Sequence, residues 1–249
     1  MLLAINIGNT NISVAIFSTT NKILRNFNIP TEAYSKTKLE KKLKNTFNLC
    51  DTVICSVVPK LTKVLQRDLK LLTGKQPYII GKKAVVPIKN LYQRGQLGQD
   101  RLVNAYSACA FYSAPLIIID SGTAITFDVV SKNQIYLGGL IVPGMEISLK
   151  ALGEKTALLP FVKLRPPSRI IARDTKNSIL SGIVFGFSAL CKELVIRIRR
   201  HLGKNVLVLG TGGNIDLIKR YSGIKIKIDK NLTLKGINYI YINEIKKRV

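Results

Sequence analysis

The chain has 249 residues, of which 47% are hydrophobic and 21% charged, and its 39 lysines and arginines against 14 acidic residues give a net charge of +25. This composition predicts a folded protein with a sizeable core and excludes a disordered chain. The basic residues are scattered along the sequence with few aromatic neighbours. That pattern favours a generally basic surface over a dedicated nucleic-acid site.

The histidine and cysteine content limits the chemistry that the chain can perform. The single histidine, His201, lies in the basic stretch RIRRHLGK and is predicted to be a solvated residue at a helix end. Cys50, Cys55, Cys109 and Cys191 form no C-x-x-C pair and are predicted to be core thiols. Any catalysis must therefore rely on carboxylates, hydroxyls, backbone amides and metal ions. No apolar run is long enough for a membrane span and no signal peptide is evident, so we expect a cytoplasmic protein.

Residues 3–17, LAINIGNTNISVAIF, predict a strand, a tight turn and a second strand, which we call the first hairpin. Its turn gathers the polar residues Asn6, Asn9 and Thr10 around Gly8. Glycine permits a positive φ and the close approach of a ligand. Successive backbone N–H groups around such a turn can bind phosphate oxygens. The alternative is an ordinary β-hairpin whose turn contains a glycine.

Residues 95–108, GQLGQDRLVNAYSA, predict a turn that leads into a helix. Asp100 and Arg101 follow Gly98 at the helix start, beside unpaired backbone N–H groups. There Asp100 could accept a proton from a substrate hydroxyl, and Arg101 could bind a carboxylate with two hydrogen bonds. The alternative is that Asp100 caps the helix and pairs with Arg101 on the surface.

Residues 116–130, LIIIDSGTAITFDVV, repeat the pattern of the first hairpin, and we call them the second hairpin. Asp120 aligns with Asn6 and Gly122 with Gly8, at an offset of 120 − 6 = 114 residues. Asp120 could hold a cation that bridges phosphates, and Thr123 adds a hydroxyl. Two similar halves predict a duplicated α/β domain with a cleft between the copies. We expect the domains to span residues 1–112 and 113–249.

The stretch SILSGIVFGFSALCKELVIRIRRHLGK predicts a long helix, because its apolar residues recur every three and four positions. Gly203 is a plausible end of this helix. Its wide apolar face is buried against either the chain's own sheet or a partner. Gly182 and Gly186 would permit close approach of a neighbouring element.

The D-x-G-T turn of the second hairpin, together with its N-x-G-N-T counterpart in the first, resembles the superfamily of sugar kinases, actin and heat-shock ATPases, in which two RNase-H-like domains hold a nucleotide between two such hairpins. Further segments follow in order; they are SVVP at 56–59, YLGGLIVPGMEISLKAL at 136–152, TALLP at 156–160, DTKNSILSGIVFG at 174–186, TGG at 211–213 and LTLKGI at 232–237. Together with GQDR and DSGTAITFD, they make nearly the whole chain similar to the type III pantothenate kinases, bacterial enzymes that begin coenzyme A synthesis.

The resemblance implies ATP-dependent phosphorylation of pantothenate to 4'-phosphopantothenate, with ATP, Mg²⁺ and a monovalent cation, K⁺ or NH₄⁺, as cofactors. ATP would be bound by Asn6, Ile7, Gly8, Asn9, Thr10, Asn11, Ile12, Ser13 and Thr123. Pantothenate would be bound by Tyr92, Gly98, Gln99, Asp100, Arg101 and Thr175. Asp100 would be the general base and Asp120 the ligand of the monovalent cation. The family also implies a homodimer in which Thr175 reaches the partner's site, and neither a membrane nor a nucleic acid as partner.

The chain departs from the family pattern at two places. The family's first hairpin begins with aspartate, whereas this chain has Asn6, which keeps an acceptor oxygen but lacks the negative charge. The family also has a proline between the tyrosine and the G-x-D-R turn, where this chain has Arg94 and Gly95, so the segment that follows Tyr92 departs from the family pattern. The alternative function is therefore a catalytically weakened relative that acts as a nucleotide-binding factor or as a transcription accessory factor.

Overall fold

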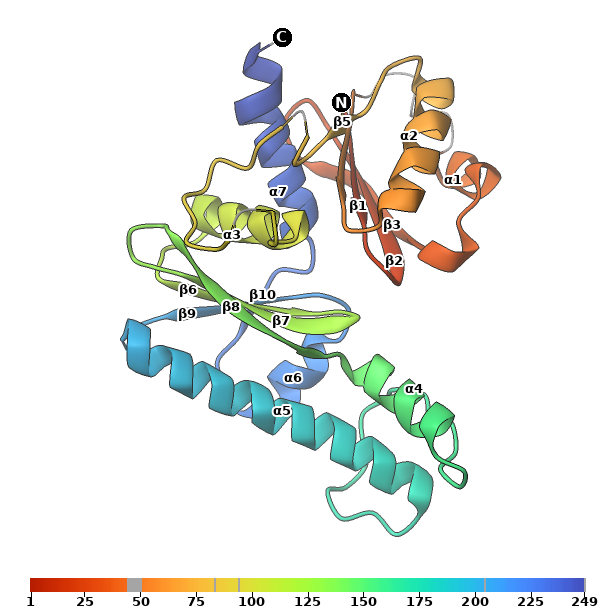
Figure 1. Ribbon diagram of the computed structural model, residues 1–249, viewed down its shortest axis with the longest axis vertical. Coiled ribbons are helices and arrows are strands. Elements are labelled where there is room, and N and C mark those ends of the chain that lie inside the picture. Colours follow the sequence, from red (N-terminus) through yellow and green to blue (C-terminus); the bar gives the residue numbers. More distant parts are fainter. Residues whose placement is uncertain (44–50, 83, 94, 204, 249) are drawn as a thin grey trace. The chain divides into compact units, whose positions relative to one another are not determined.

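The computed structural model describes residues 1–43, 51–82, 84–93, 95–203 and 205–248. They divide into two units, each built on one five-stranded sheet (Figure 1). Unit 1 comprises Met1–Ile88, Tyr92–Phe111 and Asn231–Val249, and unit 2 comprises Lys89–Leu91 and Tyr112–Lys230.

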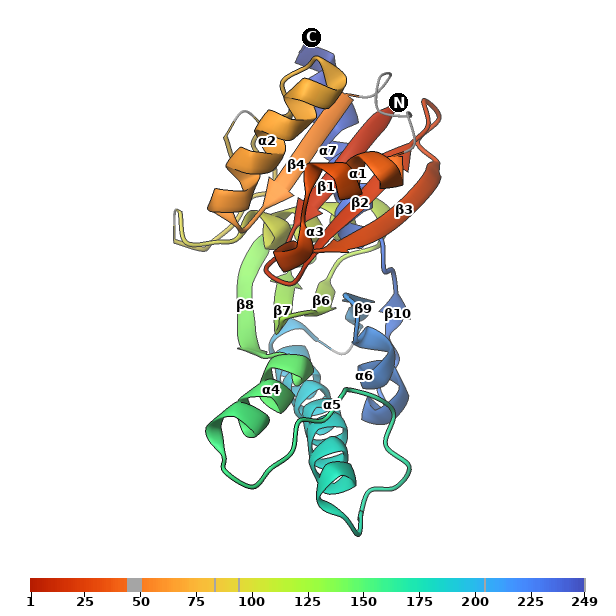
Figure 2. The ribbon, with the colours of Figure 1, turned by 90° about the vertical axis from the view of Figure 1, so that its right-hand side faces the viewer.

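The sheet of unit 1 contains five strands in the order β3-β2-β1-β4-β5, most of which are visible in Figure 2. The first three, β1 (Leu2–Ile7), β2 (Asn11–Phe17) and β3 (Ile23–Pro30), form an antiparallel meander. The other two, β4 (Asp51–Ser56) and β5 (Tyr78–Ile79), extend the sheet from β1 in parallel. The β-branched, apolar sequences of β1, β2 and β4 suit strands that are buried on both faces of a sheet.

Helices cover both faces of this sheet. One face packs against α1 (Lys36–Leu43) and α2 (Pro59–Thr73) around a core that includes Ile5, Ile54 and Leu65 (Figure 1). The other face lies against α7 (Leu232–Ile240), which in turn packs on α3 (Gln99–Phe111). After α7 the chain continues as a short π-helix, Tyr241–Ile245, and a 3₁₀ turn, Lys246–Arg248.

The sheet of unit 2 repeats the topology of the first. Its strands are β6 (Leu116–Ser121), β7 (Ala124–Val130), β8 (Tyr136–Pro143), β9 (Leu207–Thr211) and β10 (Lys227–Ile228), in the order β10-β9-β6-β7-β8. As in unit 1, the first three are antiparallel and the last two run parallel to the first. Both units therefore have the same strand order and directions, and the predicted duplication of an α/β domain is confirmed.

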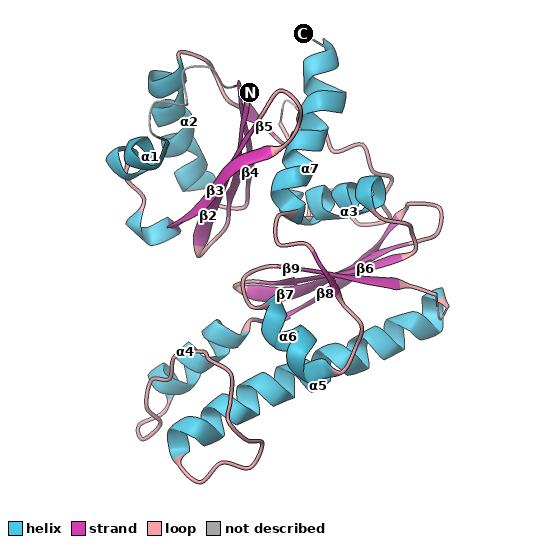
Figure 3. Cartoon of the chain, turned by 180° about the vertical axis from the view of Figure 1, so that it is seen from behind, coloured by secondary structure: helices cyan, strands magenta, loops and turns pink. Residues whose placement is uncertain are grey.

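Three helices belong to unit 2: α4 (Met145–Lys155), α5 (Thr175–Leu202) and α6 (Ile215–Ser222). Figure 3 shows α5 and α6 on the same face of the sheet. The predicted long helix is confirmed: α5 ends at Leu202, and Gly203 caps it. Gly203 has a φ of +94°, and its N–H donates to the carbonyl of Arg199. Within the described residues, α5 alone is long and apolar enough to cross a membrane by length and composition, a test that core helices of soluble proteins also pass.

The C-terminal segment from Asn231 groups with unit 1, whereas the expected boundaries place residues 113–249 together. The reason is a set of contacts between α3 and α7. The Ser107 hydroxyl donates to the carbonyl of Leu232 at 2.9 Å, and the Thr233 hydroxyl bonds the Asn104 side chain at 2.7 Å. A side chain at Gly236 would meet the Val103 carbonyl at 2.9 Å, so this glycine allows the two helices to approach closely.

The described cysteines are core thiols, as predicted. Cys55 and Cys191 are buried, Cys109 is partly buried, and all three are free. Burial raises the pKa of Cys109 to about 11 and that of Cys191 to about 12, so both are neutral thiols at pH 7. Cys50 lies outside the described residues. His201 is exposed in the last turn of α5, as predicted.

Candidate active site

The turn of the first hairpin connects β1 and β2. Asn6 pairs with Ser13 and Ile7 with Ile12 in antiparallel register, and the N–H of Gly8 donates to the carbonyl of Asn11 at 3.0 Å. Asn9, Thr10 and Asn11 are exposed at the tip. The side chains of Ile7 and Ile12 are fully buried in the core, so these two positions offer a ligand only their backbone groups.

The glycines of the two hairpin turns do not use the positive φ that glycine permits. The glycines in the left-handed region include Gly81 and Gly212, and neither Gly8 nor Gly122 is among them. A Cβ on Gly8 would stand 3.2 Å from the Asn11 carbonyl oxygen. Glycine at this position therefore permits a tight turn with an open approach to the backbone, and it does not serve an unusual φ.

Asn6 is the first polar residue of the hairpin and lies near the carboxyl end of β1. Its Oδ1 atom is buried and has no hydrogen-bond partner among the described residues. A buried acceptor without a partner is costly unless something binds it. Asn6 also pairs in parallel register with Cys55 on β4. Adjacent strands are about 4.8 Å apart, so Cys55 is its immediate neighbour in the sheet.

Asp100 lies in the first turn of α3. Its Oδ1 accepts a hydrogen bond from the backbone N–H of Arg101 at 2.9 Å. A Cβ on Gly98 would stand 2.6 Å from that same oxygen, so a side chain at position 98 would displace the carboxylate. Burial raises the pKa of Asp100, and the N–H and charge of Arg101 oppose this only in part. A carboxylate with a raised pKa is a better proton acceptor than one in water.

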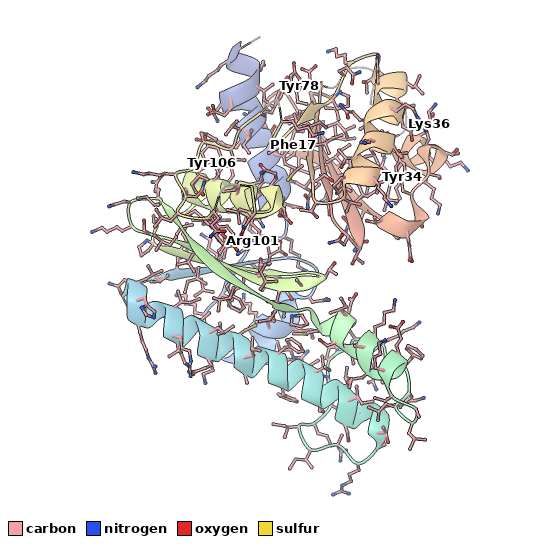
Figure 4. All side chains as sticks on the ribbon, viewed as in Figure 1. Phe17, Tyr34, Lys36, Tyr78, Arg101 and Tyr106 are labelled. Atoms are coloured by element: carbon pink, nitrogen blue, oxygen red, sulfur yellow. The ribbon has the colours of Figure 1, made fainter. Side chains whose placement is uncertain are left out.

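The structure brings the other residues of this segment together around Asp100. Arg101 is only 7% exposed, so the alternative of a surface pair with Asp100 is wrong. Its guanidinium carbon lies 5.9 Å from the centre of the Tyr92 ring, a cation–π contact, and Figure 4 marks Arg101 at the start of α3. Gly81, at a φ of +85°, leaves the space that the Gln99 side chain occupies.

Cys55 links the first hairpin to Asp100, a neighbour that the sequence did not indicate. The thiol is fully buried, and its pKa is raised first by burial and then by the charge of Asp100. Val57, which follows directly after β4, also contacts both the first hairpin and the Asp100 turn. Val57 donates its N–H to the Ile7 carbonyl at 3.1 Å and would be 3.8 Å from a Cβ on Gly98. The first hairpin and the Asp100 turn therefore meet at the carboxyl ends of β1 and β4.

The second hairpin lies in unit 2 and holds Asp120 and Thr123. The N–H of Gly122 donates to the Ala124 carbonyl at 3.0 Å. Gly212 of the TGG segment has a φ of +89°, and a Cβ there would stand 2.6 Å from Asp120 Oδ1. The glycine thus lets the end of β9 approach the carboxylate, and Asn214 extends the contact by donating its N–H to the Ser121 carbonyl at 3.1 Å.

Thr175 is the first residue of α5 and is exposed. Asp174 caps this helix by accepting the N–H of Asn177 at 3.0 Å. The Asn177 side chain also donates to Asp174 Oδ2 at 2.7 Å, and these side-chain and backbone hydrogen bonds lower the pKa of Asp174, so it is ionised at neutral pH. Thr175 belongs to unit 2, as do Asp120 and Thr123, whereas the first hairpin and the Asp100 turn belong to unit 1.

The duplicated sheet with polar turns after the first strand of each copy is the fold of the sugar kinases and actin-like ATPases. A putative 2-dehydro-3-deoxygalactonokinase from Sinorhizobium meliloti shares it over 98% of this chain and 100% of its own, with a TM-score of 0.58 and 12% identity. A putative Baf family transcriptional activator from Campylobacter jejuni shares it over 99% and 100% of the two chains, with a TM-score of 0.63 and 19% identity.

Sequence comparison narrows this class to a family. The model of the type III pantothenate kinase family matches residues 2–197. A type III pantothenate kinase of Finegoldia magna is 37% identical, and the match covers 99% of this chain and 98% of that protein. The chain belongs to the type III pantothenate kinase family, and the resemblance noted from its motifs is confirmed.

Proposed function

We propose that this chain transfers the γ-phosphoryl group of ATP to the primary hydroxyl of pantothenate, the first step of coenzyme A biosynthesis. Family membership supports the reaction. The observation that carries it is the meeting of the first hairpin with the Asp100 turn at the carboxyl ends of β1 and β4. Phosphoryl transfer requires a phosphate-binding turn and a proton acceptor to lie close together, as these two segments do.

For each candidate site residue of unit 1, the surroundings suggest a role. The exposed backbone amides of the first hairpin would bind ATP phosphates. Asp100 would take the proton of the pantothenate hydroxyl, because its carboxyl group is largely but not fully buried and has a raised pKa. Arg101, held over Tyr92, would bind the pantothenate carboxylate. Gly98 and Gln99 would contact pantothenate beside Asp100 and Arg101.

The metal ions implied by the family suit the residues at these turns. No group of three or more carboxylate, histidine or cysteine residues that could hold a metal is found in the described part of the chain. Mg²⁺ does not need one, because it binds nucleotides through phosphates, waters and one or two protein oxygens. The buried Asn6 Oδ1, which has no hydrogen-bond partner among the described residues, would supply one such oxygen. Mg²⁺ would neutralise phosphate charge when it is bound.

The function is tested by measuring ADP release with ATP and Mg²⁺, with and without pantothenate. We expect release to depend on pantothenate and to fall to background with an analogue that lacks the primary hydroxyl. ADP release without phosphopantothenate would refute the kinase assignment and leave a nucleotide-binding relative. In that case a gel shift with nucleic acid that persists at moderate salt would favour the accessory-factor alternative.

We expect activity to require K⁺ or NH₄⁺ through Asp120. Its carboxylate stands beside Ser121 and the closely approaching Gly212, where backbone oxygens can join it around a large monovalent cation. Turnover is measured in buffers that contain only Na⁺ or only K⁺. Asp120→Asn should remove the difference between the two buffers. Equal rates of the unaltered enzyme in both buffers would contradict this role.

We expect a homodimer in which Thr175 completes the partner's site. The exposed positions of α5 include Gly182, Gly186 and Ala189, which leave a smooth face where another helix can pack. A Cβ built on Gly186 would meet no atom of a neighbouring element within 4 Å in the described part of the chain, so Gly186→Arg should fold, yet it should yield monomers with little activity. Gly186→Ala is the matched control. Light scattering that shows only monomers of the unaltered chain would refute the shared site.

The proposal includes a cytoplasmic location. The free thiols of Cys55, Cys109 and Cys191 support it, because such thiols are typical of a reducing compartment.

A further inference from the structure

In both units the third strand ends at a proline, and the residue after it bonds to the turn of the hairpin. In unit 1, β3 ends at Pro30, and Thr31 follows. The N–H of Thr31 donates to the Thr10 carbonyl at 2.9 Å. The hydroxyl of Thr31 donates to the Gly8 carbonyl at 2.8 Å. Thr31 therefore holds two carbonyl groups of one turn.

Unit 2 has the corresponding contact without a side chain. There β8 ends at Pro143, and the N–H of Gly144 donates to the Thr123 carbonyl at 3.0 Å. A Cβ on Gly144 would stand 2.3 Å from the Thr123 oxygen and 2.5 Å from the Gly122 oxygen. Real Cβ atoms do not approach so closely, so only glycine can occupy this position without moving the turn.

These bonds decide which backbone groups the hairpins offer to a ligand. In a trans peptide the carbonyl and the following N–H point in opposite directions. Since Thr31 binds the carbonyls of Gly8 and Thr10, the N–H groups of Asn9 and Asn11 point away from Thr31. A turn whose carbonyls are held on one side offers N–H groups on the other, and this arrangement binds anions.

Thr31 is itself fixed by the helix that it begins. It opens the 3₁₀ turn η1 (Thr31–Ala33), and Tyr34 closes the turn by donating its N–H to the Thr31 carbonyl at 3.4 Å. The Tyr34 hydroxyl, labelled in Figure 4, donates to the carboxylate of Asp68 at 3.0 Å. Asp68 is buried on α2. The hairpin is therefore tied through Thr31 and Tyr34 to a core helix.

We propose that Thr31 and Gly144 are positioning residues for the nucleotide phosphates, each fixing the carbonyls of one hairpin so that its N–H groups face the ligand. The inference rests on the proposed function and on the ATP contacts that the family resemblance implies for each hairpin, at Asn6–Ser13 in the first and at Thr123 in the second. It assigns no chemical step to either residue. Thr31 acts through the backbone of Gly8 and Thr10, and Gly144 acts through the backbone of Thr123.

The test for Thr31 removes its hydroxyl and keeps its shape. Thr31→Val should raise the Kd of MgADP, measured by calorimetry, and the KM for ATP by about two- to tenfold, the effect of one hydrogen bond. The KM for pantothenate should not change. Thr31→Ser, which keeps the hydroxyl, should restore nucleotide affinity. The matched control is Thr73→Val, because the Thr73 hydroxyl makes an equal 2.8 Å bond to the Leu69 carbonyl at the far end of α2.

An unchanged Kd in Thr31→Val would overturn the inference and leave the kinase function standing. Equal losses of affinity in Thr31→Val and Thr73→Val would also overturn it, since that result would mean a general loss of stability. If the unaltered chain bound MgADP but did not phosphorylate pantothenate, the proposed function would fail, and the Kd series would still decide the role of Thr31.

Gly144→Ala tests the second hairpin. The added methyl group must push the Thr123 carbonyl away, so we expect a larger rise in the KM for ATP than in Thr31→Val. A folded variant with unaltered ATP affinity would overturn the role of Gly144. If the variant does not fold, Gly144 has no room for a methyl group and the Thr31 series decides the inference.

Discussion

Asp100→Asn is expected to lower kcat by about 100-fold or more while the protein stays folded, in line with the contribution of a general base. The asparagine keeps the shape of the side chain, and its Oδ1 can still accept the N–H of Arg101, which now bonds the carboxylate at 2.9 Å. The amide cannot accept a proton from a hydroxyl. The measurement is kcat together with the melting temperature, and near-normal turnover would remove Asp100 from the role of base.

The pH profile gives a second test of Asp100. Burial raises the pKa of this carboxyl above its usual range, and only the ionised form can act as a base. Activity should therefore be lost as the pH falls through this raised pKa, at a higher pH than for an ordinary aspartate. The residual activity of Asp100→Asn should lack this acidic limb.

The matched control for Asp100→Asn is Asp216→Asn. Asp216 lies in the first turn of α6, and its salt bridge with Lys230 is more than half exposed. Exposed ion pairs contribute little to stability, so this variant should behave as the unaltered enzyme does. A loss of kcat in Asp216→Asn that matched the loss in Asp100→Asn would show that the charge change, not the position, causes the effect.

Local patterns were sufficient to predict both hairpins, the duplication and α5. Their signals are contained in short windows: alternation in residues 11–17, apolar spacing of three and four in residues 178–204, and a matched glycine in each hairpin turn. Strand and helix periodicity are local properties of a chain. The family resemblance then selected Asp100 and Arg101, and the structure shows both side chains largely buried, as a base and its neighbour would be.

Contacts between segments that lie far apart in the sequence could not be predicted in this way. The return of α7 to unit 1 depends on the fit of Gly236 against Val103, and no pattern within residues 231–240 indicates it. The neighbourhood of Cys55 and Asp100 joins a strand end to a helix start 45 residues later, by 100 − 55. Thr31 and Gly144 gave no signal because their bonds depend on where the third strand of each sheet ends.

Asn6→Asp is expected to raise kcat/KM for ATP by about 5- to 150-fold, which corresponds to about 1–3 kcal/mol, the scale of charge-assisted hydrogen bonds. The variant restores the residue with which the family's first hairpin begins. Asn6 Oδ1 is already buried and lacks a partner among the described residues, so the oxygen stands where a group on Mg²⁺ or its waters could bind. The neutral amide oxygen accepts such a bond more weakly than a carboxylate does. Residual activity rather than none is therefore expected of the chain as it stands.

The same substitution should have the opposite effect on the protein without its ligand. A buried carboxylate without a counter-charge is costly, so Asn6→Asp should lower the melting temperature in the absence of nucleotide. MgATP should then raise the melting temperature more in the variant than in the unaltered chain, because a ligand that binds the folded state more tightly stabilises it more.

Asn28→Asp, which adds the same charge at an exposed position of β3, is the control and should show neither effect. A fall in kcat/KM for Asn6→Asp, with the protein still folded, would mean that the packing around β1 and Cys55 has adapted to a neutral side chain. In that case Asn6 would be the residue to which this enzyme's site is adapted, and it would not be the cause of a weakened activity.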